Sequence, residues 1–174
     1  MNEVSSSRVR VRPLTPPDGP LYRELRLAAL QDSPSAFASS YEEEEPRPPE
    51  HFSERLAGKD QSRVFGAFLD ERLVGMVGLY WQPRPKLRHK AHVWGVFVRA
   101  EARGQGCGRA LFAALIDYAQ SLEGVRYLHL GVSVGNVSAT RLYEAFGFET
   151  YGVEPVALVV EGQDFDEALM ALKL

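Results

Sequence analysis

The stretch 93–118 constrains this chain more than any other, because its residue pattern changes twice along its length. An apolar and β-branched run at Val93–Val98 predicts a buried strand. Three glycines at alternate positions follow, flanked by Arg103 and Arg109. From Ala110 onward the apolar residues repeat with helical spacing. The order is therefore strand, basic glycine turn and helix, and the predicted apolar face of the helix holds Leu111, Ala114, Leu115, Tyr118 and Leu122.

A basic glycine turn in this position is suited to binding an anion. The first turn of a helix has unpaired N–H groups and a partial positive charge. Gly104, Gly106 and Gly108 would let the backbone adopt positive φ and approach a ligand closely. A tight connection without a ligand is the alternative, but it needs neither so many glycines nor two arginines. We therefore expect this turn to bind a phosphate or pyrophosphate.

Two common phosphate-binding loops do not match this turn. The P-loop pattern G-x-x-x-x-G-K-[ST] is absent from the sequence. The dinucleotide pattern G-x-G-x-x-G fails as well, because the glycines at 104, 106 and 108 have the wrong spacing. Phosphoryl transfer from a nucleotide is disfavoured, since the P-loop lysine and a metal-binding carboxylate motif are both missing.

Length and composition favour an ordinary globular enzyme or binding protein. A chain of 174 residues predicts a single domain over 1–174, with a flexible polar tail at 1–7. The formal net charge of −3 argues against a nucleic-acid partner. The one cysteine, Cys107, excludes an internal disulfide, and no Cys/His spacing indicates a metal site. The lack of any apolar run of membrane length favours a cytoplasmic protein without a membrane partner.

The remaining pattern predicts an α/β fold with a mixed sheet covered by helices on both faces. We expect helices from Asp18 to Leu30, from about Pro48 to Gly58, and at Ser138–Ala145. Residues 156–160 stay open between strand and loop. The predicted strands are Arg8–Arg12, Ser62–Leu69, Leu73–Trp81, Lys90–Arg99, Tyr127–Val134, Phe148–Val153 and Asp164–Leu174.

Two motifs together resemble those of the Gcn5-related N-acetyltransferase (GNAT) superfamily. Residues 103–108, RGQGCG, are similar to the signature [Q/R]-x-x-G-x-[G/A] that follows a strand in that superfamily. Residues 136–148, NVSATRLYEAFGF, are similar to its second pattern, N-x-x-[AS]-x-x-[LF]-Y-x-x-x-G-F. The segment 36–45, AFASSYEEEE, resembles a bacterial subgroup without an assigned acceptor. The resemblance covers most of the chain, from Arg8 to the last strand.

The resemblance implies a fold and a cofactor site. The sheet would open between the strands Val93–Val98 and Tyr127–Val134, with acetyl-CoA in the opening. The first of these strands would pair with the pantetheine arm, the glycine turn would bind the pyrophosphate, and Asn136 would hydrogen-bond the pantetheine. The cofactor-binding residues implied are Val96, Phe97, Val98, Arg103, Gly104, Gln105, Gly106, Cys107, Gly108, Arg109, Asn136 and Tyr143.

The reaction implied by the resemblance needs a proton donor for the leaving thiolate. A thiol has a pKa of about 8.5, so a hydroxyl beside the sulfur assists its departure. The resemblance places Tyr143 there, and we expect it to be the general acid. By spacing alone Tyr143 would instead be a core residue beside Leu142 and Phe146. Cys107 is not expected to be a nucleophile, because no base neighbours it in the sequence.

The acceptor amine must lose a proton before it attacks, because an alkyl ammonium has a pKa of about 10.4. In some members of the superfamily a base lies six residues before the valine that precedes the loop, which is His92 in this chain. Strict alternation would place His92, Trp94, Val96 and Val98 on one face of the strand. Solvent and a glutamate of the run Glu42–Glu45 are the alternatives, and His92 could equally be structural or merely exposed.

The function expected from the resemblance is transfer of the acetyl group of acetyl-CoA to a primary amine of a small molecule or peptide, by direct attack in a ternary complex without metal. The alternative is a non-catalytic acyl-CoA-binding or regulatory module. The run Glu42–Glu45 is either a solvated surface or an electrostatic funnel for a cationic amine such as a polyamine, amino sugar or amino-acid derivative. The resemblance also allows a homodimer. The acceptor loops implied are 37–49, 81–89 and 153–163, with Tyr41, Trp81 and Trp94 as aromatic candidates.

Overall fold

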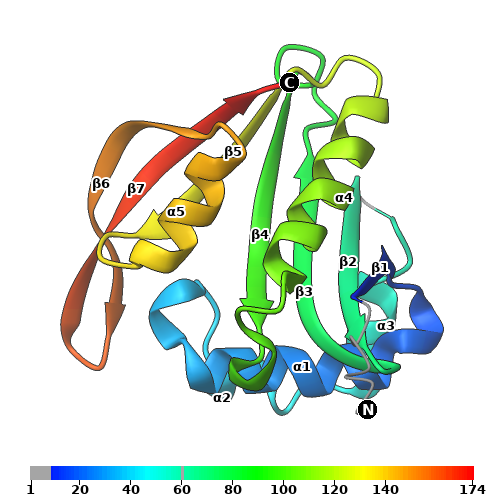
Figure 1. Cartoon of the computed structure of the whole chain (residues 1–174). Helices are drawn as coiled ribbons and strands as arrows, with labels where there is room; N and C mark the ends of the chain where they lie inside the picture. The colour runs from blue at the N-terminus through cyan, green and yellow to red at the C-terminus, as the bar shows by residue number, and fades with distance from the viewer. Residues whose placement is uncertain (1–8, 60) are drawn as a thin grey trace, which may run out of the picture.

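The computed structural model describes residues 9–59 and 61–174, so the predicted tail at 1–7 and Arg8 lie outside the described residues. Seven strands form one sheet in the order β1-β2-β3-β4-β5-β7-β6 (Figure 1). Neighbouring strands are antiparallel except β4 and β5, which are parallel, so the predicted mixed sheet is confirmed. The strands are β1 Arg10–Pro13, β2 Ser62–Leu69, β3 Arg72–Trp81, β4 Lys90–Val98, β5 Tyr127–Ser133, β6 Glu149–Val160 and β7 Gln163–Lys173.

Helices cover both faces of the sheet and create two apolar cores. One core packs α4 and α5 against one face, and the other packs α1 and α3 against the opposite face. The helices are α1 Gly19–Asp32, α2 Tyr41–Glu44, α3 Pro49–Arg55, α4 Cys107–Ser121 and α5 Val137–Ala145, with short 3-10 turns at Pro16–Asp18, Pro34–Ala36 and Ala100–Ala102. Residues 156–160, which the sequence left open between strand and loop, belong to a strand, because β6 continues through them with an irregular register.

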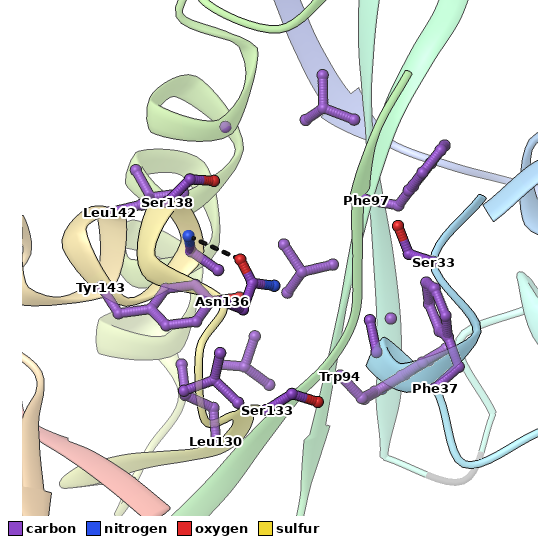
Figure 2. A pocket seen from close by; sticks show the side chains of 18 of the residues that line it. Ser33, Phe37, Trp94, Phe97, Leu130, Ser133, Asn136, Ser138, Leu142 and Tyr143 are labelled. Atoms are coloured by element: carbon purple, nitrogen blue, oxygen red, sulfur yellow. Dashed lines mark hydrogen bonds between the residues drawn. The ribbon is translucent and has the colours of Figure 1, made fainter. Parts of the chain in front are cut away.

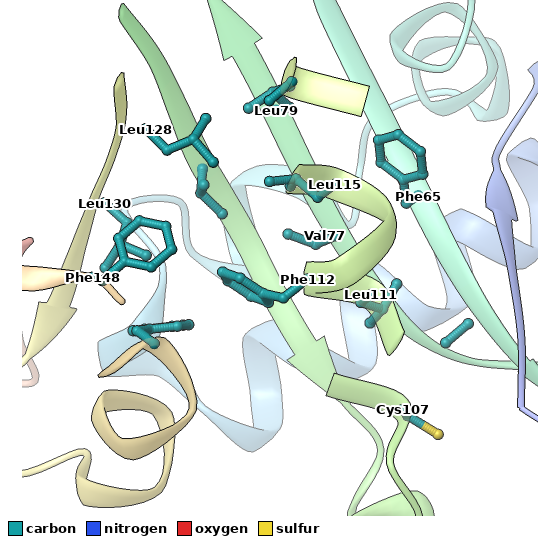
Figure 3. Close-up of a cluster of buried hydrophobic side chains, with 14 of the residues drawn as sticks. Phe65, Val77, Leu79, Cys107, Leu111, Phe112, Leu115, Leu128, Leu130 and Phe148 are labelled. Atoms are coloured by element: carbon teal, nitrogen blue, oxygen red, sulfur yellow. The ribbon is translucent and has the colours of Figure 1, made fainter. Parts of the chain in front are cut away.

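Helix α4 begins at Cys107, one turn earlier than its apolar period indicates, because Cys107, Gly108 and Arg109 at the end of the glycine turn are already helical. Its buried face includes Leu111 and Leu115 as expected, and Phe112 in addition (Figure 3). The Phe112 ring lies 5.0 Å from that of Tyr143 and 6.1 Å from that of Phe148. Helix α4 therefore connects the sheet to α5 through aromatic contacts.

Strand β4 contains a β-bulge that the sequence pattern did not reveal. Trp94 and Phe97 pair with residues of β3 that are only two positions apart, so Gly95 and Val96 together lie opposite the single residue Val77. Gly95 has a φ of 63°, a conformation that glycine adopts without strain. The bulge reverses which face the following side chains occupy.

The expectation that His92, Trp94, Val96 and Val98 share one face is therefore wrong. Trp94 packs with Phe97 against the core of α1, whereas Val96 and Val98 pack against the core of α4. Alternation assumes a regular strand, and the extra residue at the bulge breaks the period of two. Both faces of β4 consequently contribute side chains near the bulge.

Strands β4 and β5 separate after a short paired segment. Their register runs from Lys90 with Tyr127 to His92 with His129, and no further pair joins them within the described chain. Figure 1 shows β4 and β5 diverging from the end of the sheet where this pairing occurs. The predicted opening between the two strands is thus present, and it starts beyond His92.

The acidic run does not behave as a uniform solvated surface. Glu42, Glu43 and Glu45 are exposed, but Glu44 is buried and forms ion pairs with Arg26 at 2.7 Å and Arg55 at 3.5 Å. Burial opposes ionisation of Glu44, yet the two arginines outweigh it and hold its pKa below the ordinary value. For Glu44, both the surface interpretation and the funnel interpretation are therefore wrong.

Asp18 occupies the position before α1 as expected, but its carboxylate does not cap that helix. Both carboxylate oxygens accept hydrogen bonds of 2.7 Å from Arg12, and the backbone N–H of Thr15 donates a third of 2.8 Å. The Arg12 hydrogen bond is the main reason that the pKa of Asp18 falls to about 2, with burial opposing it. The interaction joins β1 to the start of α1.

This interaction predicts an acid-dependent loss of stability. A carboxyl group whose pKa is lowered by folding stabilises the protein above its unfolded pKa, and the contribution disappears as the pH falls through its folded pKa. We expect Asp18→Asn to reduce the free energy of unfolding by about 2 kcal/mol at pH 7, and the deficit to shrink between pH 4 and pH 2. Urea titrations at several pH values measure this. Asp117→Asn, at an exposed position of α4, is the matched control and should change little.

Candidate active site

A cavity of about 790 Å³ lies where β4 and β5 separate. One wall consists of β4 from Val93 to Val98 and the glycine turn, and the opposite wall consists of β5 and the start of α5. Figure 2 shows Asn136, Leu142 and Tyr143 on the α5 side, facing Phe97 across the cavity. The segment from Ser33 to Ser39 closes the end nearest α1. The cavity thus joins the glycine turn at one end to an aromatic and polar region at the other.

The glycine turn has the geometry of an anion site. Gly104 and Gly106 have φ values of 76° and 84°, and a Cβ on either would meet no atom within 4 Å. Gly106 occupies the position before α4, where none of the described side chains caps the helix. The first N–H groups of α4 are consequently available to a ligand, with the positive end of the helix dipole behind them.

Gly108 serves a different purpose from the other two glycines. A Cβ at Gly108 would lie 3.1 Å from the Leu142 side chain of α5. The missing side chain therefore lets α5 approach the first turn of α4 closely. Asn136, the residue before α5, lines the cavity as well.

Two arginines flank the turn and have different partners. Arg103 donates from Nε to the carbonyl of Val98 at 2.9 Å and from Nη2 to Asp32 at 2.8 Å, which holds the turn against β4 and the end of α1. Arg109 is exposed and lies over the Phe146 ring at 5.6 Å. Both line the cavity. Gln105 does not line it, and its amide donates to the Glu101 carbonyl at 3.0 Å instead.

Asn136 lies at the centre of the cavity (Figure 2). Its side-chain oxygen accepts a hydrogen bond of 3.2 Å from the N–H of Ala139, which caps α5 and fixes the side chain. The amide nitrogen points into the cavity, where it can donate to a ligand carbonyl. Asn136 therefore combines a structural role with an available donor.

Tyr143 extends from α5 into the same cavity and is 4% exposed. Its ring packs against Phe112 and Phe148, so its orientation is fixed by the core. Burial raises the pKa of Tyr143 well above its ordinary value, so the hydroxyl keeps its proton throughout the neutral and mildly alkaline range. A buried, protonated hydroxyl facing a cavity can donate a proton or a hydrogen bond, but cannot act as a base.

Cys107 lines the cavity but is buried at the start of α4. Burial raises the pKa of its thiol, which keeps the sulfur protonated and weakly nucleophilic. This agrees with the expectation that Cys107 is not a nucleophile.

His92 is not among the residues that line the cavity. It forms the last register pair with His129 before the strands separate, and its ring stacks on Tyr80 at a centroid distance of 6.5 Å. Burial, together with the nearby charge of Lys90, lowers the pKa of His92, so it is neutral at pH 7. The histidine lies at the apex of the opening, one residue away from the cavity wall that starts at Val93.

Sequence reasoning missed two charged residues of the cavity. Arg26 comes from α1 and Glu167 from β7, and both line the cavity, Arg26 as a buried and Glu167 as a partly buried side chain. Burial and the neighbouring Glu154 raise the pKa of Glu167. A Cβ at Gly131 of β5 would collide with the Glu167 carboxylate, so that glycine makes room for it. Both residues are remote from the motifs, and only the folding of α1 and β7 around the opening indicates them.

Within residues 9–59 and 61–174, no group of three or more His, Cys, Asp or Glu side chains is placed to hold a metal ion. The helices of the described chain are also too short or too polar for any of them to span a membrane.

The chain is similar in sequence to known acetyltransferases. The family model described as acetyltransferase (GNAT) family matches residues 27–148, more than half of the chain. The L-amino acid N-acetyltransferase AaaT of Escherichia coli is 29% identical over 127 residues, covering 72% of this chain and 78% of that protein. A mycothiol acetyltransferase of Thermobispora bispora is 36% identical over 97 residues, covering 51% of this chain and 32% of that protein.

A solved structure shares the whole fold. The putative acetyltransferase yncA from Salmonella typhimurium, determined with its cofactor acetyl-CoA, has a TM-score of 0.78 and 21% sequence identity. The match covers 97% of this chain and 95% of that chain, and it confirms the predicted fold. The chain therefore belongs to the acetyltransferase (GNAT) family and is an acetyl-CoA-dependent N-acetyltransferase.

Proposed function

We propose that the protein transfers the acetyl group directly to a primary amine while both substrates are bound. The observation that carries this proposal is a single cavity that contains an anion-binding turn at one end and the buried, protonated Tyr143 in its wall. Acetyl-CoA supplies the acetyl thioester. The glycine turn would hold its pyrophosphate, and β4 from Val96 to Val98 and Asn136 would hold its pantetheine arm.

Tyr143 is the proposed general acid. Its raised pKa keeps the hydroxyl protonated, and its fixed ring holds the hydroxyl at the cavity wall. A thiolate leaving with a pKa of about 8.5 would take this proton more readily than bulk water could deliver one. A chain that only bound acyl-CoA would have no need of such a hydroxyl in the cavity.

Release of the CoA thiol tests the proposed function. We expect little release from acetyl-CoA alone and rapid release when a suitable amine is added. A panel of amino acids, polyamines and amino sugars is appropriate, because the names of the two relatives above point to different acceptors. Binding of acetyl-CoA without turnover of any amine would support the non-catalytic acyl-CoA-binding module instead.

His92 is the proposed base and would act through water, because it lies just outside the cavity lining. The lowered pKa of His92 places the acidic limb of the kcat/KM profile below pH 6.5. We expect His92→Gln to remove that limb and to lower kcat/KM at pH 7 roughly tenfold, with a smaller effect at high pH, where more of the amine is already neutral.

Full pH profiles of the wild type and variants measure this. His51→Gln is the matched control, because His51 also has a lowered pKa but lies in α3 against Phe52. A His92→Gln enzyme with the wild-type limb would eliminate His92. If Glu167→Gln then loses the acidic limb of the kcat/KM profile, the base is Glu167, the carboxylate that lines the cavity.

We also propose that the chain acts as a single domain in the cytoplasm, as its composition suggests. A homodimer is supported by the exposed apolar side chains of Tyr151, Val153 and Val159 on the edge strand β6. Light scattering during size-exclusion chromatography measures the mass directly. A monomeric mass at micromolar concentration would contradict the dimer.

A further inference from the structure

Arg26 is a charged side chain at the wall of the cavity although it is only 5% exposed. It extends from α1, and its guanidinium lies over the Phe37 ring at 4.9 Å. Its Nη1 lies beside the bulge, since a Cβ on Gly95 would be 3.7 Å from that atom. A buried guanidinium aimed at a cavity is costly unless its donors are satisfied.

Glu44 accepts hydrogen bonds from only some of the N–H donors of this guanidinium. Its carboxylate accepts hydrogen bonds from Nε at 3.1 and 3.2 Å and from Nη2 at 2.7 Å. No hydrogen bond from Nη1 is present among the described residues. The edge formed by Nη1 and the second hydrogen of Nη2 therefore remains available, and this planar edge matches the two oxygens of a carboxylate.

The charge around Arg26 also favours an anion. Arg26 and Arg55 both contact Glu44, so one carboxylate faces two guanidinium groups. Two further acidic groups of α1 have arginine partners of their own, because Asp32 pairs with Arg103 and Glu24 pairs with Arg99. The cluster beneath the bulge thus carries one positive charge in excess.

The opposite wall offers the complementary charge. Glu167 of β7 lines the cavity and has no hydrogen-bond or ion-pair partner in the part of the chain that the structure describes. Its raised pKa reflects burial and the nearby Glu154, so a cation placed beside it would be stabilised. Ser133, which pairs with Glu167 across the strands, donates a hydrogen bond to the Ser35 carbonyl. Glu167 therefore lies at the end of the cavity that the 33–39 segment closes.

Aromatic side chains line the same cavity as these two charges. Phe37, Trp94 and Phe97 line the α1 side of the cavity (Figure 2). The Trp94 indole occupies the space over Gly78, where a Cβ would collide with it. The cavity therefore offers an apolar surface together with a guanidinium and a carboxylate.

We propose that the acceptor is an α-amino acid with an apolar side chain, and that Arg26 binds its carboxylate. Its ammonium group lies toward Glu167, and its side chain packs on the aromatic surface. This inference rests on the proposed function, because it names the acceptor of that reaction. In the transfer, the N–C bond forms as the C–S bond of the thioester breaks. The ammonium first loses one proton to the base, and the departing thiolate takes one from Tyr143. The nitrogen then loses its second proton after the attack, and this proton restores the hydroxyl of Tyr143.

Matched acceptors test the role of the carboxylate. L-leucine, L-leucinamide and 3-methylbutylamine share one side chain but differ in the group that Arg26 would bind, and the L-phenylalanine series repeats the comparison. Hydrogen bonds to charged groups contribute roughly 1.5–3 kcal/mol, so we expect kcat/KM for the amino acids to exceed that for the amides roughly 10- to 100-fold.

Variants assign this preference to Arg26. Arg26→Lys keeps a positive charge beside Glu44 but removes the planar edge, and it should lower kcat/KM for L-leucine roughly tenfold or more while leaving L-leucinamide nearly unchanged. The double variant Arg26→Met with Glu44→Met removes the buried pair together and guards against misfolding. Arg55→Lys is the matched control, since Arg55 contacts Glu44 but does not line the cavity.

Two kinetic outcomes would overturn the inference. Equal rates for acid and amide would show that the carboxylate is not recognised. An equal loss on all acceptors in Arg26→Lys would place Arg26 in acetyl-CoA binding or folding. If no amine is acetylated, calorimetry of L-leucine with the CoA-bound protein separates the two proposals. Binding that Arg26→Lys abolishes would retain the amino-acid site without the reaction, whereas absence of binding would reject the site.

Discussion

A Gly106→Asp variant should lose at least roughly 100-fold in acetyl-CoA affinity while keeping its fold. Gly106 precedes α4 with a φ of 84°, and a Cβ there would project into open space. Aspartate is one of the few residues that tolerate this conformation, so misfolding is not expected. The new carboxylate would stand where we propose that the pyrophosphate of acetyl-CoA binds, and two like charges 4 Å apart repel by about 4 kcal/mol at an effective dielectric constant near 20.

Calorimetric titration with acetyl-CoA, in buffer containing EDTA, measures this loss. Gly106→Asn is the matched control, because it has the same shape and backbone tolerance but no charge. The asparagine variant should bind acetyl-CoA much more tightly than the aspartate variant. Wild-type affinity in a folded Gly106→Asp protein would show that the pyrophosphate binds elsewhere.

Replacing Tyr143 by phenylalanine should lower kcat roughly 10- to 1000-fold, overlapping the range typical of general acids. The ring remains, so its packing against Phe112 and Phe148 and the melting temperature should be preserved. Affinity for acetyl-CoA should also change little, because the proposed role of the hydroxyl is to protonate the leaving group. Since burial raises the pKa of Tyr143, the wild-type rate should not fall through ionisation of this tyrosine between pH 7 and pH 9.

Single-turnover kinetics are needed here, because slow product release would hide a change in the chemical step. Phe146→Leu, at a partly buried neighbour outside the cavity lining, is the control for altered packing around the same helix. An unchanged single-turnover rate in Tyr143→Phe would remove Tyr143 from the mechanism.

Much of the fold could be predicted because local pattern and tertiary packing agree in this chain. The helical period after the glycine turn reappears as the buried face of α4, with Leu111 and Leu115 in the core. The apolar runs at 62–69 and 73–81 form the hairpin β2–β3 with the expected boundaries, apart from one residue at Arg72. Long periodic segments of this kind leave few alternatives.

The features that sequence reasoning missed depend on contacts between distant segments. The bulge at Gly95 exists because β4 gains one residue relative to β3, and no local pattern marks that shift. Glu44 looks like one of four equivalent surface glutamates, and only its contact with Arg26 of α1 makes it a buried ion-pair partner. Burial of a charge becomes favourable only after its partner is in place, so composition cannot indicate it.

The candidate site likewise has one part that local motifs indicate and another that depends on contacts between distant segments. The glycine turn, Asn136 and Tyr143 lie in two local motifs, and the structure brings them to one cavity. Arg26 and Glu167 enter that cavity from opposite ends of the chain, outside either motif. The part of the cavity that we propose for the cofactor was therefore accessible from sequence, whereas the part that we propose for the acceptor required the arrangement of α1, β5 and β7.

The most direct test of the account is the location of acetyl-CoA on the protein in solution. A chain of 19.4 kDa is suitable for titration by two-dimensional NMR of its backbone amides. We predict saturable shifts that are largest at 96–109 and 136–143, on both sides of the opening between β4 and β5. An absence of shifts, or shifts confined to β1 and β2 at the edge of the sheet away from the opening, would contradict the proposed acetyl-CoA site.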